Sequence, residues 1–171
     1  MTLTLRRDVE CLESIGFGDV LPIRLVSSEQ IAIQEGLFTW PAESPQLIAS
    51  KCGACAEITF PRQDSCPACA GREVEDVLLS QRGTLWTFTV QHFPPPVPFI
   101  GPTDRENFEA FGVGYVELPE GIRVEGRLTE NDPERLEIGM EMELSIEKFV
   151  EDDQGRDVMT FAWRPLTGTG E

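Results

Sequence analysis

Four cysteines arranged in two pairs constrain the fold of this chain more than any other feature of its sequence. Cys52 and Cys55 form the first pair and Cys66 and Cys69 the second, with two residues inside each pair and ten between the pairs. A tight turn presents two cysteines at this spacing to one point, and two such turns surround a tetrahedral ion with four thiolates. A glycine and a proline directly follow the first cysteines of the two pairs, which is typical of such turns. The spacing therefore predicts a zinc ribbon.

Two other uses of paired cysteines fit the sequence less well. A disulfide framework needs an oxidising compartment, and residues 1–10 lack the apolar stretch of a secretory signal. A redox dithiol of the thioredoxin type does not occur twice at ribbon spacing. Four thiolates leave no open position for water, so the predicted zinc is structural rather than catalytic. Cys11 lies outside the pattern and is expected to be a bystander.

The charge of the chain excludes several classes of ligand. Its 171 residues include 14 basic and 30 acidic side chains, which give a formal net charge of -16. Such an acidic excess repels polyanions, so sequence-independent binding to nucleic acid or to anionic membranes is not expected. Apolar residues make up 40% of the chain, which is enough for a buried core, but no continuous apolar run is long enough to span a bilayer. We therefore expect a globular cytoplasmic protein.

Residues 1–45 show no strong periodicity and are interpreted as an N-terminal arm. Short helices are expected there, one near residues 7–15 and one that begins with Ser27 as a capping residue and Gln30 three positions later. Apolar side chains are scattered along the second half of the arm, which has little room for a core of its own. Such an arm either wraps the rest of the protein or docks on a partner, and the sequence favours neither.

A zinc ribbon is expected over residues 46–78 and a larger β domain over residues 79–168. The ribbon offers three short strands, at residues 46–50, 56–60 and 73–79. Five further strands are expected in the larger domain, at residues 84–91, 111–118, 122–128, 141–150 and 157–163.

A short helix is expected between the third and fourth of these five strands. Residues 131–139 offer Asp132 as the capping residue, Pro133 at the first helical position and Gly139 at the end. Five strands with a helix at this place follow the order of an OB-fold, a small and partly open barrel. The predicted fold class is therefore mostly β: an N-terminal arm with short helices, a rubredoxin-like zinc ribbon and a five-stranded OB-fold barrel.

Several segments together resemble the acyl-CoA-associated family that joins a zinc ribbon to an OB-fold, long described as a domain of unknown function. The resemblance covers about residues 35–166, and all four cysteines of the ribbon are present. The matching segments are residues 36–41 (GLFTWP), 52–55 (CGAC), 60–61 (FP), 66–69 (CPAC), 83–90 (GTLWTFTV), 94–96 (PPP) and 114–118 (GYVEL), with Gly121.

This resemblance implies a partnership rather than a solitary reaction. Members of the family are small partner subunits of thiolase-superfamily enzymes that cleave carbon–carbon bonds or transfer acyl groups on CoA thioesters. Benzoylsuccinyl-CoA thiolase and the aldolases that shorten steroid side chains are examples. The resemblance thus implies a hetero-oligomer with a thiolase-type subunit, a structural zinc ion, and an acyl-CoA ligand of the complex.

The chain itself lacks the residues that thiolase chemistry needs. That chemistry uses a nucleophilic cysteine and a histidine base that activates it. The sequence has one histidine, His92, and its four paired cysteines are assigned to the metal. Only Cys11 remains as a nucleophile, and no base lies near it in the sequence. We therefore expect no catalytic residue in this chain and place the chemistry on the partner.

Five residues are candidates for CoA binding or for the subunit interface. The phosphates of CoA call for arginine or lysine beside an apolar surface. His92 and Phe93 end the first barrel strand, at a rim where binding loops emerge, and Arg105 lies in the following loop. Arg123 and Arg127 are evenly spaced on one expected strand and should face the same side. Pairing with glutamates of a neighbouring strand is the favoured alternative for these two arginines, and a structural or solvent-exposed role is favoured for His92.

Two functions of other classes compete with the accessory-subunit hypothesis. Zinc ribbons and OB-folds both occur in proteins that bind single-stranded nucleic acid, where aromatic side chains stack on bases. The acidic charge and the absence of clustered lysines argue against this function. A regulatory scaffold that binds another enzyme and no small ligand is the other alternative.

Overall fold

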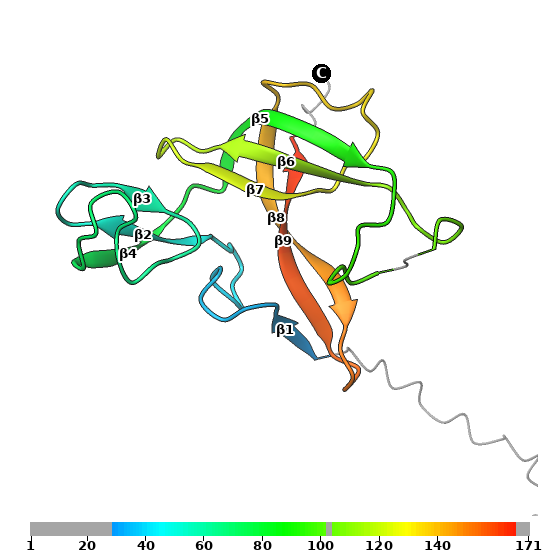
Figure 1. Cartoon of the computed structure of the whole chain (residues 1–171), viewed down its shortest axis with the longest axis horizontal. Coiled ribbons are helices and arrows are strands. Elements are labelled where there is room, and N and C mark those ends of the chain that lie inside the picture. Colours follow the sequence, from blue (N-terminus) through cyan, green and yellow to red (C-terminus); the bar gives the residue numbers. More distant parts are fainter. Residues whose placement is uncertain (1–28, 102–103, 167–171) are drawn as a thin grey trace, which may run out of the picture.

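The computed structural model describes residues 29–101 and 104–166 of the chain. These residues form nine strands in two sheets (Figure 1). The three-stranded sheet has the order β3-β2-β4, and the six-stranded sheet has the order β1-β9-β7-β6-β5-β8, with a further pairing between β8 and β9. Within this described part, no helix is long and apolar enough to cross a membrane. The strands are β1 (Gln30–Ala32), β2 (Ile48–Cys52), β3 (Ile58–Thr59), β4 (Val74–Leu78), β5 (Arg82–Gln91), β6 (Phe111–Glu117), β7 (Arg123–Leu128), β8 (Glu141–Glu151) and β9 (Asp157–Pro165).

The three-stranded sheet is the ribbon, and its strands coincide closely with those expected from the sequence. Strand β2 pairs antiparallel with both β3 and β4. Ala49 in β2 and its flanking residues Leu47 and Leu79 are completely buried. The ribbon therefore buries its apolar residues on the side away from the cysteine turns, where the barrel lies (Figure 1).

Strands β5 to β9 close into the expected five-stranded barrel. Strands β5, β6 and β7 form an antiparallel meander, β8 and β9 form a hairpin, and the barrel closes because β9 pairs parallel with β7 and β5 pairs with β8. Side chains alternate between the two faces of each strand, so Leu85, Val116 and Val124 point inward and are buried. Trp163 of β9 is completely buried and is the largest side chain of this core.

The last part of the N-terminal arm forms a strand that was not predicted. Residues Gln30–Ala32 pair parallel with β9, and Leu37 and Phe38 are buried in the core. The expected helix with Gln30 in its first turn is therefore wrong, because the backbone of these residues bonds to β9 instead. Ser27 and the helix expected near residues 7–15 lie outside the described residues.

The helix expected at residues 131–139 is replaced by two turns, so this prediction is also wrong. Its capping signal is real, because the carboxylate of Asp132 accepts a hydrogen bond from the backbone N–H of Glu134 at 2.9 Å. The helix does not continue because the next backbone groups bond to β5: Gly139 donates to the carbonyl of Leu85, and Leu85 donates to that of Met140. Tertiary hydrogen bonds thus replace those of the helix.

Ribbon and barrel share one hydrophobic core. Leu47 and Leu79 from the ribbon side belong to the same buried cluster as Leu85 and Trp163 of the barrel. At the edge of this cluster, the rings of Phe60 and Phe161 meet edge to face with their centroids 5.7 Å apart. The metal-binding unit is therefore held against the barrel by packing as well as by the chain connection.

The close approach of β5 to β6 leaves no room for a side chain at Gly83. A side chain at this position would overlap the backbone oxygen of Glu117 and lie 2.8 Å from the side chain of Leu118. Because the obstacle is backbone, we expect Gly83→Ala to lower the free energy of unfolding by about 1–3 kcal/mol, as measured by chemical denaturation. The neighbouring exposed residue provides the control: Thr84→Ala should have a clearly smaller effect, and equal stability of the two variants would contradict the packing argument.

Candidate metal centre and barrel surface

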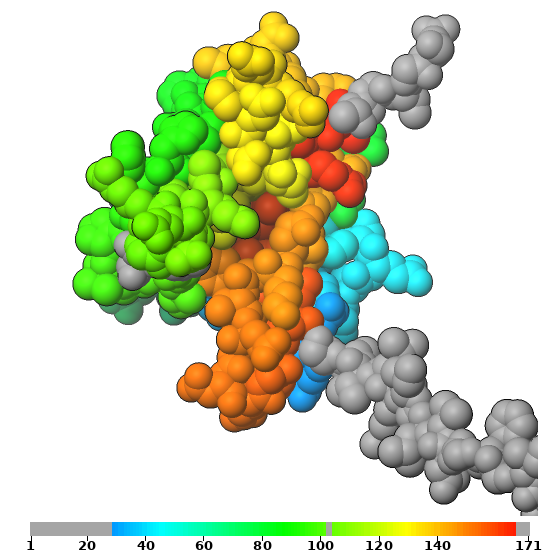
Figure 2. All heavy atoms as spheres, turned by 90° about the vertical axis from the view of Figure 1, so that its right-hand side faces the viewer, coloured from blue at the N-terminus to red at the C-terminus, as the bar shows by residue number. Residues whose placement is uncertain are grey.

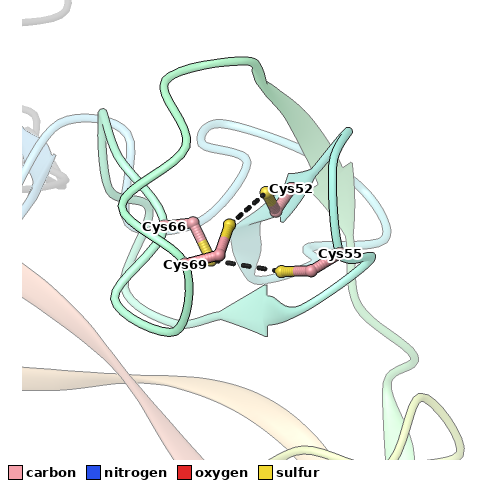
Figure 3. Close-up of side chains that lie close together, drawn as sticks. All are labelled: Cys52, Cys55, Cys66 and Cys69. Atoms are coloured by element: carbon pink, nitrogen blue, oxygen red, sulfur yellow. Dashed lines mark hydrogen bonds between the residues drawn. The ribbon is translucent and has the colours of Figure 1, made fainter.

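The four paired cysteines converge on one point, as the sequence predicts (Figure 3). Their sulfur atoms all lie within 4.8 Å of one another. The sulfur of Cys52 lies 3.6 Å from that of Cys69, and the sulfur of Cys55 lies 3.5 Å from that of Cys66. Four bonds of 2.3 Å to a tetrahedral zinc ion place sulfurs about 3.8 Å apart. The donor set and its geometry therefore fit Zn²⁺, with all four coordination positions occupied by thiolates.

Two turns of the same design hold the sulfurs in place. In the first turn the N–H of Ala56 donates to the carbonyl of Cys52, and in the second the N–H of Ala70 donates to that of Cys66, both at 2.9 Å. Both alanines have a left-handed backbone, with φ of 63° and 57° respectively. A side chain at Gly71 would lie 3.2 Å from the sulfur of Cys69, so glycine leaves room for the sulfur cluster.

The metal-free cluster cannot carry four negative charges. Backbone N–H groups of Cys55 and Ala54 donate to the sulfur of Cys52 and lower its pKa to about 7. At Cys55 the N–H of Glu57 also favours the thiolate, but the thiols of Cys69 and Cys66 and burial outweigh it and raise the pKa to about 12. A divalent cation removes this conflict, because it stabilises every thiolate that binds it.

The structure brings Phe93 and Arg105 together in the loop between β5 and β6. The guanidinium of Arg105 lies over the ring of Phe93, 4.9 Å from its centroid. His92 and Phe93 directly follow β5, and both are exposed. These three candidates lie on the surface of the loop, and the predictions of CoA binding or of an interface role for them stay predictions.

Arg123 and Arg127 share the outer face of β7, but their surroundings differ. The guanidinium of Arg123 lies 3.9 Å from the ring centroid of Trp86 and donates to Glu117 on the neighbouring strand at 2.7 Å. The glutamate pairing expected as the alternative to phosphate binding is thus present at Arg123. Arg127 lies over the ring of Phe111, 4.2 Å from its centroid, and makes no ion pair with any of the described residues.

The loop between β5 and β6 forms an apolar projection that we call the lobe, residues 92–101 and 104–110. Figure 2 shows it in green and lime at one side of the molecule. Its interior contains Phe99 and Phe108, which pack against Phe111. Val97 and Ile100, which the sequence analysis did not single out, are 83% and 57% exposed at its surface. Their exposure could have been expected from the sequence, because they lie in a proline-rich loop, where aliphatic side chains have no strand to pack on.

The fold and the four-cysteine site define a zinc-ribbon protein with an attached OB-fold barrel. Comparison with protein families gives the same two modules. Residues 39–75 match the model described as "ChsH2, rubredoxin-like zinc ribbon domain", and residues 76–147 match that described as "ChsH2, C-terminal OB-fold domain". The chain belongs to this zinc-ribbon and OB-fold family.

Relatives of this chain carry names of two kinds. A "DUF35 domain-containing scaffold protein" from Methanocaldococcus jannaschii is 30% identical over 122 residues, which are 70% of this chain and 82% of the relative. The "Benzoylsuccinyl-CoA thiolase subunit BbsA" of Thauera aromatica is 30% identical over 132 residues, 76% of this chain and 85% of that subunit. Among solved structures, a chain of the "Ltp2-ChsH2(DUF35) aldolase" is similar with a TM-score of 0.53 and 26% identity, covering 71% of this chain and 86% of that one.

Proposed function

We propose that this chain is the accessory subunit of a heteromeric thiolase-type enzyme that acts on acyl-CoA thioesters. The observation that carries the proposal is the similarity over both modules to a protein named as a thiolase subunit. The similar solved chain belongs to an aldolase complex, which supports the same type of assembly. The reaction would be thiolytic or aldolytic cleavage of a carbon–carbon bond, or acyl transfer, as in a benzoylsuccinyl-CoA thiolase or a steroid side-chain aldolase.

The chemistry of the described residues supports a partner for catalysis. The four paired cysteines share one metal site, and His92 is exposed on the surface of the lobe. No described cysteine outside the metal site is available as a nucleophile beside a histidine base. The zinc is structural in this proposal, and the catalytic cysteine and histidine belong to the thiolase-type subunit.

The lobe is the part of the surface best suited to meet that subunit. Phe93, Val97 and Ile100 expose apolar side chains within one stretch of this loop, and an isolated monomer gains no stability from exposing them. Proteins of this family are named as subunits of larger enzymes, so a protein surface is the occupant that we propose. Phe93 with Arg105, and Arg123 over Trp86, then provide cations beside rings near the route of the CoA ligand.

Co-expression with the thiolase-type protein of the same organism tests the proposal. We expect the two chains to co-purify, and we expect acyl-CoA turnover only in the complex, because the proposal places the nucleophile and base on the partner. The measurement is thioester cleavage or formation by the complex, by the partner alone and by this chain alone. Full turnover by the isolated chain, or no association with any thiolase-type protein, would contradict the proposal.

A scaffold without a small ligand is the second candidate, which the name of the archaeal relative favours. Calorimetric titration with CoA separates the two functions. The accessory-subunit proposal expects CoA to bind the complex differently from the partner alone, because this chain contributes contacts. Identical CoA binding with and without this chain favours the scaffold.

A further inference from the structure

A hollow of about 290 Å³ opens on the barrel between the end of β7 and the hairpin of β8 and β9. Figure 2 looks into this region, where β9 lies deep between the lime-green lobe, the yellow end of β7 and the orange strand β8. The hollow is lined by Arg127, Lys148, the hydroxyl-bearing residues Thr129 and Thr160, and Glu147. It thus combines cationic and hydroxyl donors in a concave site.

Arg127 is the unusual group in this hollow. Two arginines of the described chain are partly buried rather than exposed, Arg127 and Arg156. Arg156 pairs with the carboxylate of Asp152 at 2.7 Å, whereas the guanidinium of Arg127 makes neither an ion pair nor a hydrogen bond with any described residue. Burial without a counter-charge lowers the pKa of Arg127. In a chain with 30 acidic residues, a partly buried guanidinium without an acidic partner leaves its donors available to a ligand.

The aromatic cluster fixes the position of this guanidinium. Arg127 lies over Phe111, which is stacked on Phe99 at 6.0 Å with an angle of 8° and meets Phe108 edge to face. At the same time the backbone of Arg127 is in register with Ala162 of β9, which is buried. A planar fork held in this way is pre-organised for two parallel hydrogen bonds to an oxyanion.

The other charged residues of the hollow, Lys148 and Glu147, are less suited than Arg127 to bind an anion. The ammonium group of Lys148 is already paired with Asp157 and with Glu151. Glu147 is exposed and makes no ion pair with Arg127 in the described structure. Its negative charge opposes an anion in the hollow, so removal of that charge should strengthen anion binding.

We infer that the hollow at Arg127 is a binding site for an oxyanion, the phosphate or carboxylate group of a small molecule. Arg127 provides the charge and the bidentate donors, Thr129 and Thr160 provide hydroxyl donors, and the apolar lining accepts the carbon skeleton next to the anionic group. The anion site stands independently of the partner subunit, whereas its assignment to a phosphate of CoA or to a carboxylate of the acyl group rests on the proposed function.

Calorimetric titration of the zinc-loaded full chain tests the inference, with phosphate, succinate, CoA and 3′-dephospho-CoA as probes at constant ionic strength. We expect Arg127→Met to weaken binding of the preferred probe by roughly tenfold or more, since a charge-assisted hydrogen bond is lost. The matched control is Arg164→Met, which removes an arginine from the neighbouring strand β9 that is already paired with Glu143. It should change binding by no more than about twofold. Glu147→Gln should change binding in the opposite direction and make it tighter.

The preferred probe identifies the source of the anion. CoA binding much more tightly than 3′-dephospho-CoA assigns the site to the ribose phosphate, and succinate binding more tightly than phosphate assigns it to a carboxylate. Absence of binding of all four probes at roughly 10 mM, or equal binding by the wild type and Arg127→Met, would overturn the inference.

Thermal unfolding distinguishes a binding role for Arg127 from a merely structural one. In chloride buffer Arg127→Met should be nearly as stable as the wild type, because the variant loses only the contact of the guanidinium with Phe111 and no ion pair. Only the wild type should gain stability from the preferred probe. Should Arg127→Met fail to fold, Arg127→Lys keeps the charge but not the fork, and it should bind the probe more weakly at unchanged stability. A fall in stability of both variants without a change in probe binding contradicts the inference.

Discussion

Cys69→Ser should abolish stoichiometric zinc binding and unfold the ribbon, and a strong chelator should do the same to the wild type. Cys69 is exposed, so the substitution removes a ligand without opening a cavity in the core. The metal stabilises a segment with few apolar residues of its own, and the free energy of structural zinc binding is of the order of 10 kcal/mol. Nearly all of this stabilisation should be lost with one of four ligands. Zinc content and hydrogen exchange of the amides in β2 to β4 measure the two effects.

The control for this prediction is the fifth cysteine of the chain. Cys11 lies outside the paired pattern and outside the described residues. Cys11→Ser should therefore keep one zinc ion per chain and normal protection of the ribbon amides. Retention of stoichiometric zinc by Cys69→Ser, or a ribbon that stays folded after chelation, would contradict a structural four-thiolate site.

Aspartate at both Val97 and Ile100 should abolish association with the thiolase-type subunit. Both side chains are mostly exposed in this chain, so the double variant should fold and bind zinc normally. If the lobe lies in the subunit interface, each aspartate would become buried without a partner. The combined cost corresponds to at least a hundredfold loss of affinity, that is about 2.7 kcal/mol or more. Co-purification and sedimentation of the mixed subunits measure it.

Ile138→Asp is the matched control for the lobe. Ile138 is 63% exposed in the turns between β7 and β8, away from the lobe in the sequence, and it is aliphatic like the two tested residues. This variant should associate with the partner as the wild type does. If Ile138→Asp prevents association and the lobe variant does not, the subunit interface lies at the turns between β7 and β8.

The metal site and the barrel strands could be predicted from the sequence because both have a local signature. Cysteine spacing reports on the turn in which it lies, and alternation of side chains along β5 reports on its two faces. The helix expected at residues 131–139 failed although Asp132 accepts its capping hydrogen bond, because Leu85 on a distant strand competes for the backbone of the same segment. Strand β1 has only three residues, and its pairing with β9 depends entirely on the tertiary fold.

The different environments of Arg123 and Arg127 also depend on tertiary pairing and could not be predicted from local sequence. The sequence placed both on one face of a strand, and the structure agrees. What separates them is the residue opposite each one on β6: Arg123 is in register with Glu117 and is neutralised, whereas Arg127 is in register with Val113. Register is set by the whole sheet and not by the spacing of the arginines. The available guanidinium could therefore not be distinguished from the paired one in advance.

The core that spans ribbon and barrel makes these two modules poor candidates for separate expression. Cutting the chain between β4 and β5 would leave Leu47 and Leu79 on one fragment without the barrel residues that cover them, such as Leu85. Each fragment would therefore expose apolar residues that are buried in the intact chain. Because Trp163 belongs to the same core, loss of zinc should also loosen the packing around this residue and change its fluorescence. Cellular zinc supply would then govern how much of the entire subunit is competent for assembly.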